Sequence, residues 1–488
     1  MKYLLIGLLL IVTLHSRADT EQAIAQARFL INAHMEQTGT PGAQVAVWQH
    51  GTLLWSEAFG LANLENNQKM TTATPMRIAS ISKSLTSVVL MELVEEGKLQ
   101  LDTPLHQYLP GLPLALHHVT LRQLAASVSG IRHYDDTDKV NHTHYATARA
   151  ALSRFINDPP EFSPGSQFGY SSYGWVIIAA VMEQVTAQPF SSLMQRHWQQ
   201  QQLHNTFLDH TRFHPAVVST QYDLHQPSWW RSWLLGEQPT RIAAVSEDRS
   251  FIYPGGGFLS TAEDLVHYGT RLLQGQVLQQ TSVDEMWQSY RLADGSLTHY
   301  ALGWETGKNR LGSRVIFHSG SMPSARSHLV IFPKHKLVVA ILMNSGEHVF
   351  FNEREAHTVA ELFIANTQPD NTNLITGEWQ LCTTSLRNTE SCGQLSLQTD
   401  SVTGLVSGEV EFVRSDSRLK MPLVLTTSHN KVFTMVAVSP MFIDLKLQFE
   451  PGQLLGHWYH DFNVNGATEV DDYWLPRKVV ANRVNSNR

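Results

Sequence analysis

The chain has 488 residues, of which 42% are hydrophobic and 16% are charged. This apolar fraction is enough to fill a core, so global disorder is excluded, and the length predicts two or three domains. Lysine and arginine total 36 against 43 acidic residues, a formal net charge of -7. A mildly acidic chain with no basic run is not expected to bind nucleic acid. Two cysteines exclude a disulfide scaffold and a multi-cysteine zinc or iron–sulfur site.

The first 18 residues have the pattern of a secretory leader. Lys2 is followed by an almost wholly apolar run over residues 4–14, and Ser16-Arg17-Ala18 supplies the small residues of a cleavage site. We therefore predict cleavage near Ala18 and a secreted or periplasmic bacterial protein. The alternative is an uncleaved membrane anchor, but the run is short for a span of about 20 residues. No later apolar run has membrane length, so we expect no stable membrane span.

The two ends of the region that follows are predicted to build one sheet. Strand-like runs over residues 43–48 and 53–55 flank a His-Gly turn. Far downstream, residues 315–317, 327–332 and 337–342 form three more such runs with short connections. Short connections favour antiparallel neighbours. The helical segment between these ends is then an insertion that covers the sheet.

The pattern changes near residue 365, where a second domain is expected to begin. Beyond about residue 373 it stays strand-like, and over residues 441–450 apolar and polar side chains alternate before a Pro-Gly turn. We predict a first domain over residues 19–366, a polar linker over 367–373, and a β-rich barrel or sandwich over 373–488.

Ser80-Ile81-Ser82-Lys83 is an S-x-x-K motif at the start of a predicted helix. Ser80 opens a long apolar helical pattern that Gly97 closes as a C-cap. Positions i and i+3 share a helix face, so Lys83 can reach the Ser80 hydroxyl. A serine is a poor nucleophile unless a base accepts its proton, and burial lowers a lysine pKa towards that role. The alternatives are a capping serine and a lysine that extends its ammonium to solvent.

Two further segments supply groups that can complete such a site. Tyr170 lies in a loop just before a second apolar helix, where its phenol can relay a proton. The alternative for Tyr170 is a packed aromatic ring. His318-Ser319-Gly320-Ser321 follows the strand over residues 315–317 and places small residues at a strand edge, beside the position of a substrate. A lone histidine after a strand is otherwise structural.

In this order, the three segments resemble the penicillin-recognising serine hydrolases, which include class C β-lactamases, D-Ala-D-Ala carboxypeptidases and related esterases. The chain looks most similar to the mitochondrial β-lactamase-like serine proteins of animals and their bacterial relatives. The likeness runs from about residue 24 to 365 and leaves out the β-rich domain. It rests on residues 76–84 (MRIASISKS), 119–134, 164–174, 254–264 (PGGGFLSTAED), 301–304 (ALGW) and 343–344.

The resemblance implies an α/β fold with a mixed, mainly antiparallel sheet, helices on both faces and a helical subdomain. It also implies roles for individual residues. Ser80 would be the acylated nucleophile, with Lys83 as its base partner and Tyr170 as the proton relay. His318 would take the basic position of the third motif, and the backbone N–H groups of Ser80 and Ser321 would form the oxyanion hole. The substrate side would be lined by Ser172, Ser319 and Gly320.

The sequence departs from the β-lactamase pattern at three positions. Ser172 stands where an asparagine is common, His318 where a lysine is common, and Ser127 where a histidine usually precedes Ser-Gly. A serine hydroxyl makes fewer hydrogen bonds than an amide, and a histidine is only partly charged near neutral pH. These departures argue against efficient β-lactam hydrolysis but leave acyl transfer intact.

The cysteines and histidines do not indicate a metal or a cofactor. Cys382 and Cys392 lie in the second domain, where an oxidising compartment favours a disulfide that closes a hairpin, and two free buried thiols are the alternative. His142-Thr143-His144, with His133 and Asp135 nearby, is the best candidate for a metal hydrolase. It lacks the spacing of a zinc hydrolase, so a polar surface loop is the preferred interpretation.

We therefore predict a secreted serine hydrolase that cleaves an amide, peptide or ester bond through a Ser80 acyl-enzyme. The substrate is a small molecule or a peptide, and we expect no cofactor and no nucleic acid. Peptide, ester and β-lactam bonds all stay open, with Ser172 and His318 favouring the first two. The alternatives are a penicillin-binding sensor module with little turnover, and a true β-lactamase or D-Ala-D-Ala carboxypeptidase. Nothing in the sequence specifies an oligomeric state.

Overall fold

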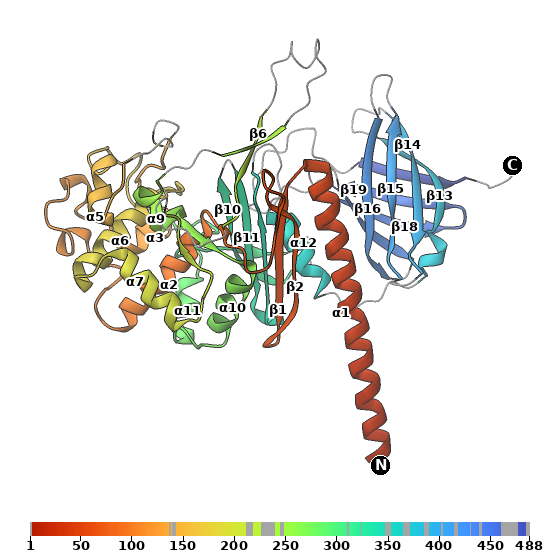
Figure 1. Ribbon diagram of the computed structural model, residues 1–488, viewed down its shortest axis with the longest axis horizontal. Coiled ribbons are helices and arrows are strands. Elements are labelled where there is room, and N and C mark those ends of the chain that lie inside the picture. Colours follow the sequence, from red (N-terminus) through yellow and green to blue (C-terminus); the bar gives the residue numbers. More distant parts are fainter. Residues whose placement is uncertain are drawn as a thin grey trace, which may run out of the picture. The chain divides into compact units, whose positions relative to one another are not determined.

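The contacts in the computed structural model divide the chain into two compact units (Figure 1). One unit spans residues 40–348, and the other combines residues 1–39 with residues 349–488. The structure describes residues 2–135, 138, 143–210, 218–225, 240–244, 248–309, 312–322, 324–346, 353–364, 371–384, 390–401, 404–413, 418–429, 431–438, 442–459 and 477–484.

A seven-stranded antiparallel sheet forms the centre of the unit over residues 40–348. Its order is β3-β2-β1-β12-β11-β10-β9, so the two ends of this unit meet in one sheet, as predicted. β1 pairs directly with β12, with Ala46 opposite Ala340. His50 and Gly51 both have positive φ and form the two-residue turn between β1 and β2. The strands are β1 (Gly42–Gln49), β2 (Thr52–Asn63), β3 (Gln68–Lys69), β9 (Glu305–Lys308), β10 (Arg314–Met322), β11 (Ala325–Phe332) and β12 (Leu337–Met343).

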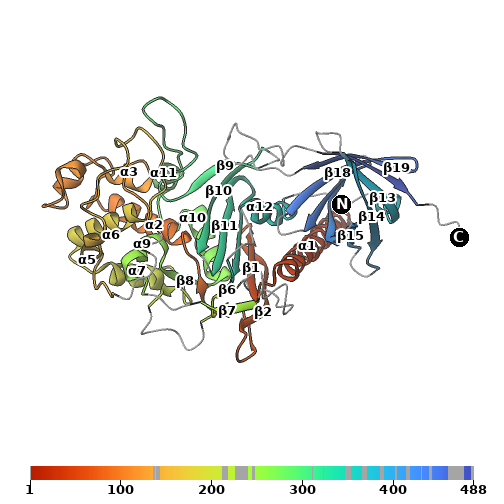
Figure 2. The same cartoon turned by 90° about the horizontal axis from the view of Figure 1, so that it is seen from above.

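The helices of this unit come between β3 and β9 in the chain. Figures 1 and 2 show α2, α5, α6, α7 and α9 as one group beside the sheet, whereas α10 packs on β1 and β12. α10 is amphipathic, and Thr261 caps it by accepting the backbone N–H of Asp264. The helices are α2 (Ile81–Glu95), α3 (Leu121–Ala125), α5 (Ala148–Ala151), α6 (Tyr173–Thr186), α7 (Phe190–Gln200), α9 (Tyr253–Gly256), α10 (Ala262–Leu273) and α11 (Gln280–Met286).

α2 and α6 form the core of the helical group. Residues 81–91 of α2 and 173–182 of α6 are all buried, as expected for helices that are apolar on every side. α2 ends before Gly97, which has a φ of 70°, so the predicted helix and its terminator are confirmed. α6 also ends at a residue in the left-handed conformation, Ala187.

Short strands tie the helical group together. β8 pairs with both β4 and β5, so the segment just before α2 lies beside the segment just after α9. The backbone N–H of Ile78 continues this pairing by donating to the carbonyl of Phe258 at 3.1 Å. The short strands are β4 (Met76–Arg77), β5 (Phe207–Leu208), β6 (Tyr222–His225), β7 (Thr240–Ala243) and β8 (Phe258–Ser260).

The C-terminal strands close into an antiparallel barrel in the order β13 to β20, with β20 returning to pair with β13. Its interior is filled by buried side chains such as Trp379, Leu395, Phe433 and Leu447. The fold class predicted from the sequence, an α/β domain followed by an all-β domain, is therefore confirmed. The strands are β13 (Gly377–Thr384), β14 (Glu390–Thr399), β15 (Val406–Val413), β16 (Arg418–His429), β17 (Val432–Val438), β18 (Phe442–Glu450), β19 (Gln453–Tyr459) and β20 (Arg477–Arg483).

Two helices belong to the same unit as the barrel. These are α1 (Lys2–Thr38) and α12 (Glu353–Leu362), and the amide of Gln26 in α1 donates to the carbonyl of Leu425 in β16 at 2.6 Å. The sequence predicts a first domain over residues 19–366 and a linker over residues 367–373. Residues 367–370 of that linker lie outside the described residues. No helix in the described part of the chain is both long and apolar enough to span a bilayer.

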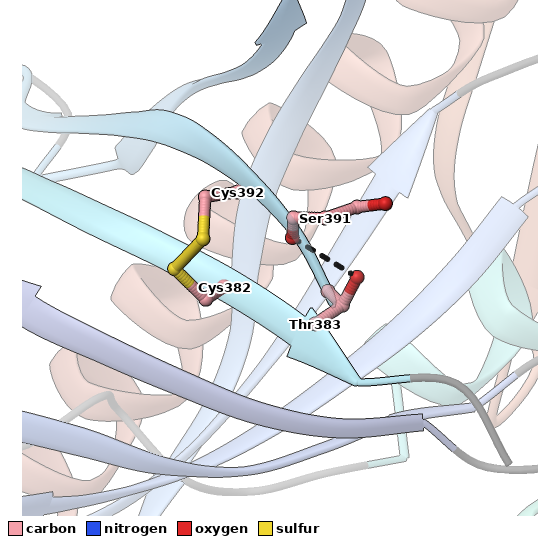
Figure 3. The surroundings of a disulfide bond; sticks show 4 residues. All are labelled: Cys382, Thr383, Ser391 and Cys392. Carbon is pink, nitrogen blue, oxygen red and sulfur yellow. Dashed lines mark hydrogen bonds between the residues drawn. A yellow bond between two sulfur atoms is a disulfide. The ribbon is translucent and has the colours of Figure 1, made fainter. Parts of the chain in front are cut away.

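A disulfide joins β13 to β14 in the barrel (Figure 3). Cys382 and Cys392 lie directly opposite each other in the ladder of the two strands. One residue further along, the hydroxyl of Thr383 donates to the carbonyl of Ser391 at 3.3 Å. The bond therefore staples a hairpin whose connecting residues, 385–389, lie outside the described part of the chain.

Candidate active site

Ser80 lies at the N-terminus of α2, just after a sharp turn. Ala79 has a φ of 44°, which is unusual for a residue with a side chain, and it packs against Met322 and Ala325. Ser80 occupies the N-cap position, but its side chain makes no capping hydrogen bond. Because the residue is also partly exposed, its hydroxyl is available at the mouth of the helix.

Hydrogen bonds from two directions fix this turn. The hydroxyl of Ser82 donates to the carbonyl of Ala79 at 2.6 Å and accepts from the backbone N–H of Phe258 at 3.2 Å. From β11, the hydroxyl of Ser327 donates to the carbonyl of Ile78 at 2.7 Å. The position of Ser80 is therefore set by both the sheet and the helical group.

Lys83 is fully buried one turn into α2, and its Nζ lies 3.1 Å from Oγ of Ser80. The same Nζ donates to the carbonyl of Gly255 in α9 at 2.6 Å. Burial holds the pKa of Lys83 well below its usual value, although the negative charge of Glu305 acts in the opposite direction. The geometry thus presents an amine with a lowered pKa to a serine hydroxyl, and the unprotonated form that a lowered pKa favours is the one that can abstract a proton.

Tyr170 covers the other side of this amine. Nζ of Lys83 lies 4.7 Å from the centre of the Tyr170 ring, and the ring is partly buried in the loop before α6. The rings of Tyr300 and His318 lie 5.9 Å and 6.3 Å from it. The structure therefore brings together the four residues that the sequence analysis proposed for catalysis.

Ser172 is buried at the N-terminus of α6. Gly255, whose carbonyl accepts the hydrogen bond from Lys83, lies against it. A Cβ on Gly255 would come within 2.9 Å of the Ser172 carbonyl oxygen, so this close approach needs glycine. The backbone N–H of Ser172 donates to Nδ1 of His133 at 3.1 Å. His133 therefore accepts a hydrogen bond at Nδ1 and orients the loop that carries Tyr170.

His318 lies on β10 with both ring nitrogens engaged. Nδ1 is 2.6 Å from the carbonyl oxygen of Ser319, which can only accept, so the ring proton sits on Nδ1. Nε2 then accepts from the hydroxyl of Tyr300 at 2.9 Å. Burial lowers the pKa of His318 to about 3, and the nearby Lys83 amine acts in the same direction when it is protonated. The sequence predicted a partly charged imidazole, whereas burial keeps this ring neutral at physiological pH.

Replacing His318 with glutamine is expected to reduce the sensitivity of the fold to acid. The pKa of the wild-type ring is near 6.5 in the unfolded chain and about 3 in the folded one. Between these values the unfolded chain binds more protons, so the wild type loses stability as the pH falls. Between pH 7 and pH 5 it should lose about 2 kcal/mol more than His318→Gln. Urea unfolding at both pH values measures this difference, and equal losses would contradict a buried neutral imidazole.

The remaining residues of the third motif follow His318 along β10. Gly320 lies so close to the turn before Ser80 that a Cβ would come within 2.3 Å of the Ile78 carbonyl oxygen. Ser319 is partly buried, and Ser321 is exposed opposite Arg326 of β11. The end of β10 therefore passes beside the segment that carries Ser80.

Three contacts in the site were not predicted from the sequence. Tyr300 holds His318, Gly255 holds Lys83, and the charge of Glu305 acts on the Lys83 amine. Gly255 lies within the stretch 254–264 that carried the family resemblance, and Tyr300 directly precedes the stretch 301–304. Those stretches marked the right regions, but no spacing rule links Tyr300 to His318.

The geometry gives no support to the metal-hydrolase alternative. Within the residues that the structure describes, the one group of candidate ligands close enough to share an ion is Cys382, Glu390 and Cys392, and its two sulfur atoms are bonded to each other. The side chains of His133, Asp135 and His144 form no such group in this part of the chain, and His142 lies outside it.

Comparisons with known proteins show the family of the chain. The family model described as beta-lactamase matches residues 27–362. The chain belongs to the beta-lactamase family. Among its relatives is the mitochondrial serine beta-lactamase-like protein LACTB of Homo sapiens, 28% identical over 323 residues that cover 52% of this chain and 57% of the human protein. The chain thus spans a little over half the length of this curated relative.

Solved structures with a similar fold cover most of the chain. An octameric penicillin-binding protein homologue from Pyrococcus abyssi has a TM-score of 0.58 at 18% identity, covering 93% of this chain and 99% of its own. The D-amino acid amidase of Ochrobactrum anthropi SV3 has a TM-score of 0.58 at 20% identity, covering 70% of this chain and 97% of its own. These neighbours share the fold of a family of serine hydrolases, which includes amidases and β-lactamases.

Proposed function

We propose that this member of the beta-lactamase family is a serine hydrolase that cleaves an amide, peptide or ester bond through a Ser80 acyl-enzyme. The observation that carries the proposal is the 3.1 Å approach of the Lys83 amine to the Ser80 hydroxyl, with burial lowering the pKa of that amine. A neutral amine at this distance can take the hydroxyl proton as the oxygen attacks a carbonyl.

The proposed reaction has two halves. Oγ of Ser80 bonds to the substrate carbonyl carbon while its proton passes to Lys83, and the backbone N–H groups of Ser80 and Ser321 hold the oxyanion. The tetrahedral intermediate collapses, the bond to the leaving group breaks, and Tyr170 relays a proton from Lys83 to that group. A water molecule then attacks the acyl-enzyme carbonyl, and its proton passes through Tyr170 to Lys83. As the bond between the acyl carbon and Oγ of Ser80 breaks, Lys83 returns the proton to Oγ and the acid is released.

The neutral third motif supports a preference for substrates that do not depend on a free carboxylate. The Nδ1 proton of His318 is donated to the Ser319 carbonyl, and Nε2 accepts from the Tyr300 hydroxyl. The ring therefore offers neither a charge nor a spare nitrogen to an anionic substrate. We propose that His318 positions β10 and Tyr300, and that esters and internal amide bonds are better substrates than β-lactams or peptides with a free D-Ala terminus.

Export is the second part of the proposal. We infer that residues 1–18 act as a leader and that the protein works outside the cytoplasm, in the periplasm or beyond. The disulfide between Cys382 and Cys392 supports this location, because such bonds persist mainly in oxidising compartments.

Substrate profiling tests the proposed activity. We expect kcat/KM for p-nitrophenyl butyrate, and for a D-Ala-D-Ala peptide with an amidated C-terminus, to exceed that for the free-acid peptide and for nitrocefin by about tenfold or more, since one charged contact contributes on the order of 1.4 kcal/mol or more. Faster turnover of nitrocefin would overturn the substrate preference. Ligand binding without turnover of any of the four would instead indicate a sensor module.

A further inference from the structure

A cavity of about 340 Å³ lies beside α9, the turn that carries the Lys83 acceptor. Its walls come from α6, α7, α9 and the segments 144–148 and 206–210, with Phe190, Trp198, Phe207 and Tyr253 as the main aromatic residues. The cavity is within the size range of small-molecule sites, roughly 300–1,000 Å³. Ser80, Lys83, Tyr170 and His318 do not line it, so it is separate from the candidate active site.

Two hydrogen-bond donors in the wall are unused. The hydroxyl of Tyr253 and Nε1 of Trp198 are buried and have no hydrogen-bond partner among the described residues, and these residues are only 8% and 2% exposed. Burial, together with the negative charges of Asp248 and Asp209, raises the pKa of Tyr253, so its phenol keeps its proton. Leaving a buried donor unpaired typically costs about 1–3 kcal/mol. An acceptor that enters from the cavity would remove this cost.

Glu183, the one acidic residue among the described residues that line the cavity, already has hydrogen-bond partners. The carboxylate of Glu183 accepts the backbone N–H groups of Ala148, Arg149 and Phe190. A ligand with extra donors therefore finds no free carboxylate on Glu183, and a cationic ligand would compete with three backbone hydrogen bonds. The wall favours a ligand that accepts hydrogen bonds.

Two imidazoles line the cavity. The rings of His144 and His210 lie 4.9 Å apart, and Nδ1 of His144 lies 2.9 Å from the carboxylate of Asp248. Among the residues that the structure describes, no lysine or arginine lines the cavity. Imidazoles without a permanent cation suit a ligand with a single negative charge better than a phosphate or a dicarboxylate.

We propose that this cavity binds a small apolar monocarboxylic acid. Its apolar part would pack on Phe190 and Phe207, and its carboxylate would take the unused donors of Tyr253 and Trp198. The acid is the kind of molecule that the proposed hydrolase itself releases, so the cavity is suited to sensing product.

The position of the cavity connects its occupant to the catalytic amine, and this part of the inference rests on the proposed function. The carbonyl of Pro254, a cavity residue, accepts from the hydroxyl of Thr86 at 2.9 Å. The next carbonyl, that of Gly255, accepts from Lys83 at 2.6 Å. A ligand that orders Tyr253 and Pro254 therefore acts on the acceptor that holds Lys83 in place.

Calorimetric titration with 4-phenylbutyrate tests the binding. Ser191→Phe fills the cavity from α7, and Ser192→Phe is the matched control, because the neighbouring Ser192 is exposed and does not line the cavity. We expect the wild type, Ser192→Phe and Ser80→Ala to bind the acid, and Ser191→Phe to bind it at least tenfold more weakly. Equal affinity of the two phenylalanine variants, or no binding by the wild type, would overturn the site. Should Ser191→Phe fail to fold in thermal unfolding, Gln195→Trp blocks the same cavity.

Two further readouts define the ligand class and the coupling. The neutral analogue 4-phenylbutyramide should bind at least fivefold more weakly than the acid, and equal binding would overturn the assignment of a carboxylate. Saturating acid should change kcat of ester hydrolysis by about fivefold or more in the wild type but not in Ser191→Phe. An unchanged kcat would overturn the coupling. Because titration needs no turnover, a failed hydrolase assignment would leave the binding result intact and distinguishable.

Discussion

Ser80→Ala is expected to abolish hydrolysis while leaving the free energy of unfolding almost unchanged. The Ser80 hydroxyl makes no capping hydrogen bond, and when it is removed the Lys83 amine that it contacts keeps its bond to the Gly255 carbonyl. Loss of a catalytic serine typically reduces kcat by 10⁴-fold or more, on the order of 10⁶ in some hydrolases. Steady-state kinetics on the best ester substrate, with urea unfolding of the same sample, measures both quantities.

Ser82→Ala is the matched control on the same turn. Its hydroxyl bonds the Ala79 carbonyl and the Phe258 N–H, and both bonds are buried. This variant should lose about 1–3 kcal/mol of stability yet keep far more activity than Ser80→Ala, because the nucleophile is still present and Ser327 still holds the turn. The reverse pattern, an active Ser80→Ala and an inactive, stable Ser82→Ala, would show that the nucleophile has been assigned to the wrong residue.

Lys83→Met is expected to reduce kcat/KM by about 10²–10⁴-fold, the usual contribution of a general base. Methionine keeps the length of the side chain and fits the buried site, but it cannot accept the Ser80 proton. The measurement is kcat/KM for the same ester, with binding of a slow substrate as evidence that the cleft persists. Near wild-type kcat/KM in this variant would remove Lys83 from the mechanism.

The same substitution should change how stability depends on pH. The pKa of Lys83 is lowered in the folded protein, whereas the unfolded chain titrates near 10.5. Below 10.5 the unfolded chain therefore binds more protons, and the wild type gains stability as the pH rises towards that value. Urea unfolding at pH 7 and pH 10 should show the wild type gaining relative to Lys83→Met. Parallel changes in the two proteins would mean that the folded amine is not neutralised by burial.

Much of the fold could be predicted because its signals are local and periodic. The apolar pattern after Ser80 and the glycine at position 97 defined α2 at both ends. Strand runs with short connections at both ends of the first unit predicted a shared sheet, which β1 and β12 form. In the second unit, alternation over residues 441–450 predicted a strand, and the structure has β18 there. It did not distinguish a barrel from a sandwich, because that depends on β20 returning to β13, about a hundred residues away in the chain.

The chemistry of the site was only partly visible in the sequence, because charge states depend on tertiary burial. Motif spacing brought Ser80 and Lys83 together through one turn of helix, as predicted. The neutrality of His318 depends instead on its depth in the sheet and on Tyr300, which approaches from a loop without a motif. α12 is a similar case. An amphipathic pattern predicts a helix, but it does not predict which of the two units the helix packs with.

The central claim is tested most directly by intact-mass analysis after incubation with a fluorophosphonate, followed by peptide mapping. We expect one adduct per chain, on Ser80, formed rapidly in the wild type, slowly in Lys83→Met and not at all in Ser80→Ala. A stoichiometric adduct on any other residue, or full labelling of Ser80→Ala, would contradict the account.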